Sequence, residues 1–304
     1  MRERLNRWWA ERVFAGTARR VLATAPMPAG EGDALLFSLV SARDLAMYLL
    51  AAKSVLRALP HLRVTVLDDG SLGPRGHGVL MRHLPGIRIM QRSQVATGRV
   101  PRDVMWERLF CSIVLARDAY VIQMDADTIA FTALDAVAGA MARGSAFILA
   151  TRERESIEPL ATAAAWAATN PSRHIQMESE RAMCGLPDAE RLSYIRGSAG
   201  FYGFPPAMVA TAAAEALFLR MNDLTGGRFQ EYGSEQFAAN FLIANLPGAL
   251  PLPWPDYAVY DGRPDVTAAP AFLHFIGTYR YHGHVYADAA RRVLAALDGA
   301  AARG

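Results

Sequence analysis

Hydrophobic residues along the chain fall into short runs that alternate with segments of helical periodicity. Buried strands are predicted at 34–40, 62–67, 87–90, 120–124 and 147–151. Residues 44–59 and 102–116, which lie between such runs, have the apolar spacing of amphipathic helices. Strands that alternate with helices in this way indicate βαβ units and a mostly parallel sheet. We therefore predict that the first half of the chain is a doubly wound α/β structure.

The second half of the chain has a less regular pattern. An alanine-rich segment occupies 157–169, and a glycine-rich segment occupies 197–201. The apolar positions predict a helix at 234–244, a late strand at 271–276 and a final helix at 287–297. The sequence contains no internal repeat, so a tandem-repeat architecture is excluded.

Residues 2–24 combine several arginines with Trp8, Trp9 and Phe14. This mixture predicts an amphipathic helix with a basic, aromatic-edged face. Two interpretations are open. The helix makes a peripheral contact with a membrane surface, or it is a solvated helix that packs Trp8 and Phe14 on the rest of the protein.

The next residues, Ala-Pro-Met-Pro-Ala-Gly at 25–30, break this helix and predict a linker. A chain of 304 residues exceeds the ~100–200 residues of a typical domain but fits one large α/β domain. We therefore expect an N-terminal helix and linker over 1–30 and a single domain over 31–304.

The composition is that of a globular protein. Hydrophobic residues make up 52% and charged residues 20%, which excludes disorder for the bulk of the chain. The net charge of +3 comes without the clustered Lys and Arg that nucleic-acid binding calls for. Cys111 and Cys184 are too few for a disulfide framework, and the start of the chain does not resemble a signal peptide. We expect a cytoplasmic protein, at the inner face of the membrane if residues 2–24 bind it.

The most informative motif is Asp125-Ala126-Asp127, directly after the predicted strand 120–124. Side chains two residues apart in an extended chain point the same way, so the two carboxylates can lie together. Such a pair suits a hard divalent cation, Mn²⁺ or Mg²⁺. In the alternative interpretation, Asp127 is a helix N-cap and Asp125 is a solvated neighbour.

A second candidate segment is the end of the late strand, where His274 interrupts an apolar run. Gly277 and Arg280 follow it. Imidazole is an acceptable ligand for Mn²⁺, glycine lets the backbone approach a phosphate, and arginine binds phosphate in a bidentate manner. The alternative is a hydrogen-bonded core histidine, which is the more common state of a buried His.

Taken together, four ordered parts of the chain resemble glycosyltransferase family 8, whose members have the GT-A fold. They are 51–55 with 66–68; Trp106-Glu107-Arg108-Leu109 through Asp125-Ala126-Asp127; 197–201 with Glu235-Gln236; and 274–280. The second part looks like the family's aromatic-X-Arg-Leu helix and Asp-X-Asp motif. The third looks like its Phe-Asn-Ala-Gly turn and Asp-Gln-Asp helix start, and the fourth like its His-X-X-Gly-X-X-Lys. The resemblance implies a GT-A fold with a Rossmann-like nucleotide-binding half and a less regular acceptor-side half.

The resemblance also implies roles for the residues that carry it. Asp125, Asp127 and His274 would hold Mn²⁺ or Mg²⁺, which would bind the diphosphate of a nucleotide-sugar. Gly277 and Arg280 would contact the same diphosphate.

Four further residues would act on the donor sugar or stand beside it. Arg108 would contact the sugar, and Ser198 would replace the asparagine of the family's turn. Glu235 and Gln236 would lie below the anomeric carbon, where they stabilise developing positive charge. Arg108 as an ordinary buried-pair or surface arginine, and Glu235 as a helix N-terminal acid, are the alternatives.

The chain also departs from the family pattern. No aspartate directly follows the first strand, so Ser41 or Asp44 is expected to contact the nucleotide, together with Asp68 after the second strand. Uridine diphosphate is the expected nucleotide. His282 and His284 replace the family's Pro-Trp region and are alternative metal ligands, or solvated loop residues.

We therefore expect a metal-dependent glycosyltransferase that moves a sugar, with retention, from a nucleotide-diphosphate sugar to a glycan, lipid-linked or protein acceptor. One alternative is a catalytically degenerate protein that binds nucleotide-sugar. The other is a haloacid-dehalogenase-type phosphotransferase, although that type has its aspartates near the amino terminus and Thr or Val where this chain has Ile129. The glycine-rich segment 73–78 is predicted to be a mobile loop.

Overall fold

In the computed structural model, the chain is described over residues 2–102, 105–263, 265–277 and 279–301. It divides into two compact units. The first comprises Met1–Ser93, Met124–Asp135 and Pro255–Gly304, and the second comprises Gln94–Gln123 and Ala136–Trp254. Positions 103 and 104 of the predicted helix 102–116 lie outside the described residues. The expected division at residue 30 rests on the sequence alone and stays a prediction.

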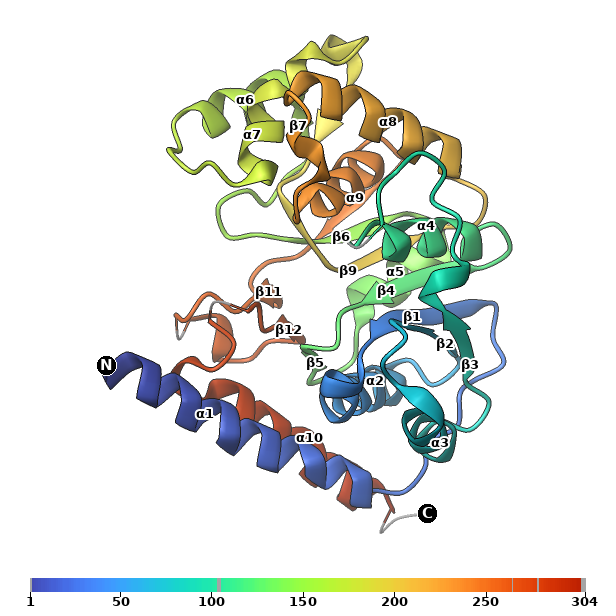
Figure 1. Ribbon diagram of the computed structural model, residues 1–304. Coiled ribbons are helices and arrows are strands. Elements are labelled where there is room, and N and C mark those ends of the chain that lie inside the picture. The colour runs from blue at the N-terminus through green and yellow to red at the C-terminus, as the bar shows by residue number, and fades with distance from the viewer. Residues whose placement is uncertain (1, 103–104, 264, 278, 302–304) are drawn as a thin grey trace. The chain divides into compact units, whose positions relative to one another are not determined.

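The first unit is built on three parallel strands, β1 (Ala34–Val40), β2 (Arg63–Asp68) and β3 (Arg88–Gln91), which are neighbours in that order. Helix α2 (Leu45–Ala58) connects β1 to β2, and α3 (Gly73–His83) connects β2 to β3. Both helices lie on the same side of these strands (Figure 1). The two connections are βαβ units, so the alternation predicted from the hydrophobic pattern is confirmed in this unit.

Segment 73–78 is the first half of α3 and not the mobile loop that its glycines predict. Pro74 stands in the first turn of the helix, where its fixed φ and missing N–H are tolerated. A Cβ atom added at Gly76 would lie 3.1 Å from the side chain of Leu72, so this glycine permits close packing. The three glycines of the segment therefore lie in a helix, and Gly76 among them packs against Leu72.

A small three-stranded sheet completes the first unit, with the order β11 (Tyr257–Val259), β12 (Phe272–His274), β5 (Thr128–Ala130). Strand β12 pairs with β11 in parallel and with β5 in antiparallel orientation. The predicted strand 271–276 is thus present but shorter. The antiparallel register pairs His274 with Thr128, which fixes where the histidine lies along β5.

Helix α1 (Arg2–Ala18) runs beside α10 (Val285–Ala301), the final helix of the chain (Figure 1). Phe14 is buried, and its ring stacks on Tyr286 with 3.9 Å between the centroids. Trp8, by contrast, is 51% exposed. Packing on the rest of the unit is therefore confirmed for Phe14 and wrong for Trp8. Among the described residues, no helix has the length and apolar character needed to cross a bilayer.

The linker after α1 is tied to α2 by Lys53, whose side chain is fully buried. The Lys53 ammonium donates to the Thr24 hydroxyl at 2.8 Å and to the Ala25 carbonyl at 2.6 Å. It also lies 3.2 Å from Nδ1 of His83 on α3. Burial lowers the pKa of Lys53 to about 8. A single buried amine thus connects the linker with two helices of the unit.

The second unit contains a sheet with the order β10 (Leu250–Leu252), β6 (Phe147–Ala150), β9 (Gly197–Phe204), β4 (Tyr120–Met124). Strand β10 is parallel to β6, whereas β9 is antiparallel to it. The last residue of β4, Met124, already belongs to the first unit. The strands predicted at 120–124 and 147–151 are therefore confirmed, and β9 adds an antiparallel neighbour that the hydrophobic pattern does not predict.

The resemblance to the family motif implies a turn at the glycine-rich segment 197–201. In the structure this segment lies instead in the buried strand β9. A Cβ atom added at Gly203 would lie 2.3 Å from the ring of Phe147, and one at Gly197 would lie 2.9 Å from Ile148. These glycines let β6 approach β9 closely. Glycine in this strand is required by packing and not by a turn, although the same glycine content is typical of turns.

A two-stranded antiparallel sheet of β7 (Glu158–Pro159) and β8 (Ser193–Tyr194) also belongs to the second unit, together with several helices. The helices are α4 (Trp106–Leu115), α5 (Asp135–Arg143), α6 (Leu160–Ala168), α7 (Ile175–Ala182), α8 (Thr211–Leu224) and α9 (Ser234–Ala244). The predicted helices 102–116 and 234–244 correspond to α4 and α9. The Trp106 ring packs edge-on against Phe218 of α8 and donates from its indole nitrogen to Ser234 at 3.0 Å. This contact joins the first turns of α4 and α9.

Candidate functional site

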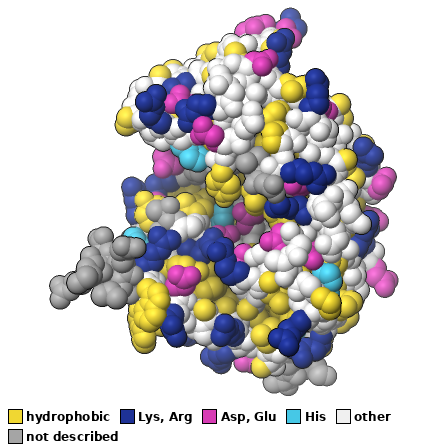
Figure 2. All heavy atoms as spheres, viewed as in Figure 1, with side chains coloured by type: hydrophobic (Ala, Val, Ile, Leu, Met, Phe, Trp, Pro, Cys, Tyr) yellow, Lys and Arg dark blue, Asp and Glu magenta, His cyan; other side chains and the backbone are white. Residues whose placement is uncertain are grey.

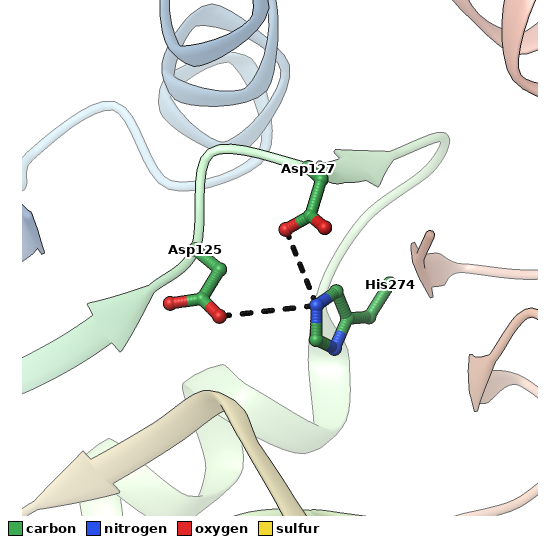
Figure 3. A group of neighbouring side chains, drawn as sticks. All are labelled: Asp125, Asp127 and His274. Atoms are coloured by element: carbon green, nitrogen blue, oxygen red, sulfur yellow. Dashed lines mark ion pairs between the residues drawn. The ribbon is translucent and has the colours of Figure 1, made fainter. Parts of the chain in front are cut away.

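Asp125, Asp127 and His274 lie next to one another in the first unit (Figure 3). Strand β4 ends at Met124, and both aspartates lie in the turn that leads to β5. The Thr128 hydroxyl closes this turn by donating to the backbone oxygen of Asp125 at 2.9 Å. The antiparallel pairing of β12 with β5 then brings the imidazole beside the two carboxylates.

The three side chains are arranged as the ligands of one cation would be. Nε2 of His274 lies 3.2 Å from Oδ1 of Asp127 and 3.9 Å from Oδ2 of Asp125. One ligand atom from each residue lies within 4.8 Å of the others, and the described part of the chain contains no second group of this kind. With bonds of about 2.1 Å, two ligands of one Mg²⁺ or Mn²⁺ ion are at most about 4 Å apart. The imidazole–carboxylate distances therefore fit a shared divalent ion.

Asp127 is the more buried of the two carboxylates, and its neighbours favour its charged form. Burial alone would raise its pKa, but the neighbouring His274 and the guanidinium of Arg280 outweigh burial and lower the pKa of Asp127 to about 2. Arg280 forms an ion pair with Asp127 and also donates from Nε to the Phe275 carbonyl at 3.1 Å. A carboxylate that stays charged at neutral pH is what a metal ligand needs.

The helix N-cap alternative for Asp127 is wrong, because the residues after it form strand β5. Arg280, which the resemblance assigns to the diphosphate, is paired with Asp127 in this structure. A guanidinium carries five N–H donors, so one ion pair leaves it with donors for a second anion. Its contact with a diphosphate stays a prediction.

Ser41 and Asp44, the candidates for nucleotide contact after β1, bind each other. The Ser41 hydroxyl donates to Oδ2 of Asp44 at 2.7 Å and accepts from the Asp44 backbone N–H at 3.3 Å. Together they close the 3₁₀ turn Ala42–Asp44 that precedes α2. The structure thus gives both residues a local role, and their contact with a nucleotide stays a prediction.

Asp68, the third nucleotide candidate, is buried at the end of β2 and accepts several hydrogen bonds from the chain itself. Its carboxylate accepts from the backbone N–H groups of Gly70 and Leu72 and from the Gln91 amide. His77 of α3 lies 2.8 Å away. Burial would raise the pKa of Asp68, but these hydrogen bonds outweigh it and hold the pKa below its ordinary value. Asp68 therefore organises the turn between β2 and α3.

Gly277 follows His274 by three residues, and its carbonyl oxygen accepts from Nη2 of Arg7 on α1 at 3.0 Å. A Cβ atom added at Gly277 would meet no described atom within 4 Å. Packing within the described chain therefore does not require glycine at this position. His282 and His284 lie in the next turn and are not part of the three-residue group.

In the second unit, Arg108 of α4 and Glu235 of α9 form a buried ion pair. Nη2 of Arg108 lies 2.7 Å from Oε2 of Glu235, and both side chains are almost fully buried. The buried-pair alternative for Arg108 is therefore present in the structure. Burying two charges is costly unless they are paired closely, so each residue depends on the other. Ser198 lies in β9, where its hydroxyl accepts from the Gly200 backbone N–H at 3.3 Å.

Gln236 reveals a residue that the sequence does not point to, Gln176 of α7. The Gln236 amide donates to Oε1 of Gln176 at 2.6 Å. Gln176 in turn donates to Glu180 at 3.2 Å, and Glu180 is paired with Arg196. Gln176 stands outside the quoted motifs, and the helix that carries it is not predicted separately, so the sequence offers no signal for it.

Comparisons with known proteins identify the fold. No protein-family model matches the chain, and no curated protein matches it in sequence. The crystal structure of the galactosyltransferase LgtC with donor and acceptor sugar analogues matches with a TM-score of 0.55 and 13% identity, over 87% of this chain and 95% of that chain. An active-site mutant of LgtC gives a TM-score of 0.53 and 14% identity over the same shares. The bifunctional glycosyltransferase WbbM gives a TM-score of 0.51 and 13% identity, over 81% of this chain but 46% of WbbM.

These similarities show the architecture. The chain has the α/β fold of the GT-A glycosyltransferases, so the fold class predicted from the sequence is confirmed. Because a fold can host many activities, the function of this chain has to be argued from its own residues.

Proposed function

We propose that this protein is a metal-dependent glycosyltransferase that transfers a sugar from a nucleotide-diphosphate donor, with uridine diphosphate as the nucleotide. The observation that carries the proposal is the group formed by Asp125, Asp127 and His274 at the carboxyl end of a strand. Ligands of α/β proteins commonly bind at such strand ends. The GT-A fold supports the same class of reaction.

In this proposal, the two carboxylates and the imidazole hold Mn²⁺ or Mg²⁺. The ion would neutralise the diphosphate as it leaves the sugar. Arg280 would add a positive charge beside the same diphosphate, and the backbone at Gly277 would approach it closely because no side chain intervenes.

The residues proposed to act on the donor sugar are Arg108, Glu235 and Gln236. Ser198 is proposed to take the place of the asparagine in the family motif. The carboxylate of Glu235 would balance the positive charge that develops at the anomeric carbon, and Arg108 would orient Glu235 through their 2.7 Å ion pair. Retention of configuration is part of the proposal through the family resemblance. Gln176 would hold the Gln236 amide in place.

The acceptor is a glycan, a lipid-linked sugar or a protein, and the protein acts in the cytoplasm on this proposal. The region 31–304 is proposed to work as one glycosyltransferase domain. Nucleic acid is not among the proposed partners. A catalytically degenerate protein and a phosphotransferase of the haloacid-dehalogenase type are the rival functions, and they are separated by what the protein releases from its substrate.

A turnover screen tests the proposal. The full chain is incubated with a panel of UDP-sugars and Mn²⁺, with and without simple sugar acceptors, and UDP release is measured. We expect release from at least one donor, lost on chelation and in Asp127→Asn but retained in Asp118→Asn, an exposed acid of matched chemistry. UDP binding without release from any donor would support the degenerate protein. Phosphate release from phosphomonoesters without UDP release would support the phosphotransferase.

A further inference from the structure

Helix α1 has two faces of different character. Its inner face packs on the first unit through Ala10, Phe14, Thr17 and Ala18, which are buried. Phe14 stacks on Tyr286 of α10, which fixes the rotation of the helix about its own axis. The outer face is therefore held toward solvent by packing and is not free to turn inward.

The outer face carries two large aromatic side chains in the open. Trp8 is 51% exposed and Trp9 is 59% exposed. The guanidinium of Arg12, one turn along the helix from Trp8, lies 4.7 Å from the Trp8 ring centroid. Exposed indoles at adjacent positions are uncommon on a monomer and indicate a surface that another body covers.

Basic residues continue this face. Arg12, Arg19 and Arg20 are exposed, the last two in the 3₁₀ turn that follows α1, and Leu22 after them is 37% exposed. Between residues 6 and 22, the sequence contains one acidic residue, Glu11. In Figure 2, hydrophobic and basic side chains stand next to each other along α1, with an acidic side chain among them.

We infer that this outer face of α1, defined by Trp8, Trp9, Arg12, Arg19 and Arg20, docks on an anionic lipid bilayer surface. Indole rings partition to the boundary between headgroups and acyl chains because they have an apolar body and one N–H donor. Arginines along the same helix meet negatively charged headgroups, each contributing about 1 kcal/mol near the surface. A helix that lies in the interface plane needs this combination and no membrane span.

The inference does not depend on the proposed function, because it rests on α1 alone. If the proposed glycosyltransferase function is correct, the inference also places the reaction at a membrane surface. Arg7 of the same helix donates to the Gly277 carbonyl, so a membrane-bound α1 would keep the proposed diphosphate loop near the lipid surface. An acceptor anchored in that surface by a lipid would then be presented at short range.

Vesicle sedimentation tests the inference. The full chain is mixed with vesicles of equimolar phosphatidylglycerol and phosphatidylcholine, or of phosphatidylcholine alone, at low and high salt. We expect binding to the anionic vesicles that weakens with salt, accompanied by a blue shift of tryptophan emission. Arg12→Glu/Arg20→Glu should lower the partition coefficient by at least about tenfold. Trp8→Ser/Trp9→Ser should remove the blue shift and weaken binding at high salt.

The matched control is Arg75→Glu/Arg88→Glu, which changes the charge equally at exposed positions away from α1 and should bind as the parent chain does. Circular dichroism of each variant verifies that the fold is retained. Equal binding by the Arg12→Glu/Arg20→Glu variant and this control would overturn the inference. A second outcome would also overturn it. If duplex DNA displaced the protein from the vesicles and tryptophan emission showed no blue shift on vesicle binding, the face would be a nucleic-acid surface instead.

Discussion

His274 and Asp127 face each other across two antiparallel strands, with Nε2 of the imidazole 3.2 Å from Oδ1 of the carboxylate. The pairing of His274 with Thr128 produces this contact, because it aligns the end of β12 with the residue that follows Asp127. Backbone register therefore holds the imidazole against the turn that also carries Asp125. Because the backbone pairing positions these side chains, replacing one of them should leave the positions of the other two nearly unchanged. A substitution there therefore reports on the side chain that is replaced.

Gly277→Ala separates packing from ligand approach. An added Cβ meets no described atom within 4 Å, so thermal stability should stay within about 0.5 kcal/mol of the parent. If a diphosphate lies against this backbone, UDP affinity should fall by about tenfold or more. Calorimetric titration of the variant measures this. Unchanged affinity would remove Gly277 from the proposed donor site.

The buried pair of Arg108 and Glu235 predicts asymmetric effects of single and double substitutions. Glu235→Gln removes the carboxylate charge that lies 2.7 Å from the Arg108 guanidinium and should lower the free energy of unfolding by about 3–5 kcal/mol. Arg108→Met/Glu235→Leu removes both charges and should restore most of that loss. Denaturant unfolding measures stability, and UDP release measures turnover. Turnover that stays absent in the stable double variant supports a role in the reaction, whereas restored turnover would mean that the pair is structural.

Gln176 is predicted to act through Gln236. Gln176→Met removes the acceptor of the 2.6 Å hydrogen bond while keeping side-chain length, so turnover should fall about ten- to hundredfold with little change in donor KM. The double variant Gln176→Met/Gln236→Met should be no slower than Gln236→Met alone. Gln230→Met, at an exposed position, is the control. Additive losses in the double variant would contradict a shared action.

His83 gives the first unit a pH dependence. Burial and the nearby charges of Lys53 and Arg82 lower the pKa of His83 to about 4. The unfolded chain, with an ordinary His pKa near ~6.5, binds more protons between these values, so stability rises with pH from about 4 to about 6.5. Acidification to about pH 4 should cost on the order of 2 kcal/mol through this group. Denaturant unfolding of His83→Gln should show a smaller loss, and an equal loss would contradict the assignment.

The sequence predicts the parts of the protein that depend on local pattern. Buried strands are continuous apolar runs, and Asp125 and Asp127 stand immediately after one of them, so their place at a strand end follows directly. His274 is also visible in the sequence, as the polar residue within the apolar run 271–276. Its place beside the two aspartates is what the family resemblance implies, whereas the pairing of β12 with β5 that produces the contact does not follow from the periodicity.

Other features depend on contacts between distant segments and are missed or misassigned. Glycines at 73–78 hide the helical periodicity of α3, and Gly76 has its reason only in Leu72. Glycines in β9 read as a turn because the approach of Phe147 is not visible in the sequence. The pairing of Arg280 with Asp127 and of Gln236 with Gln176 joins residues far apart in the chain, and no local pattern reports it.

The most direct test of the metal-dependent donor site is a calorimetric titration of the full chain with UDP, in Mn²⁺ and after chelation. We predict binding of about micromolar strength that requires the metal. It should weaken at least about tenfold in Asp125→Asn and His274→Ala and be unchanged in Asp118→Asn. UDP binding of equal strength without metal, or unaffected by both site substitutions, would contradict the assignment of Asp125, Asp127 and His274 as the metal ligands of a nucleotide-sugar site.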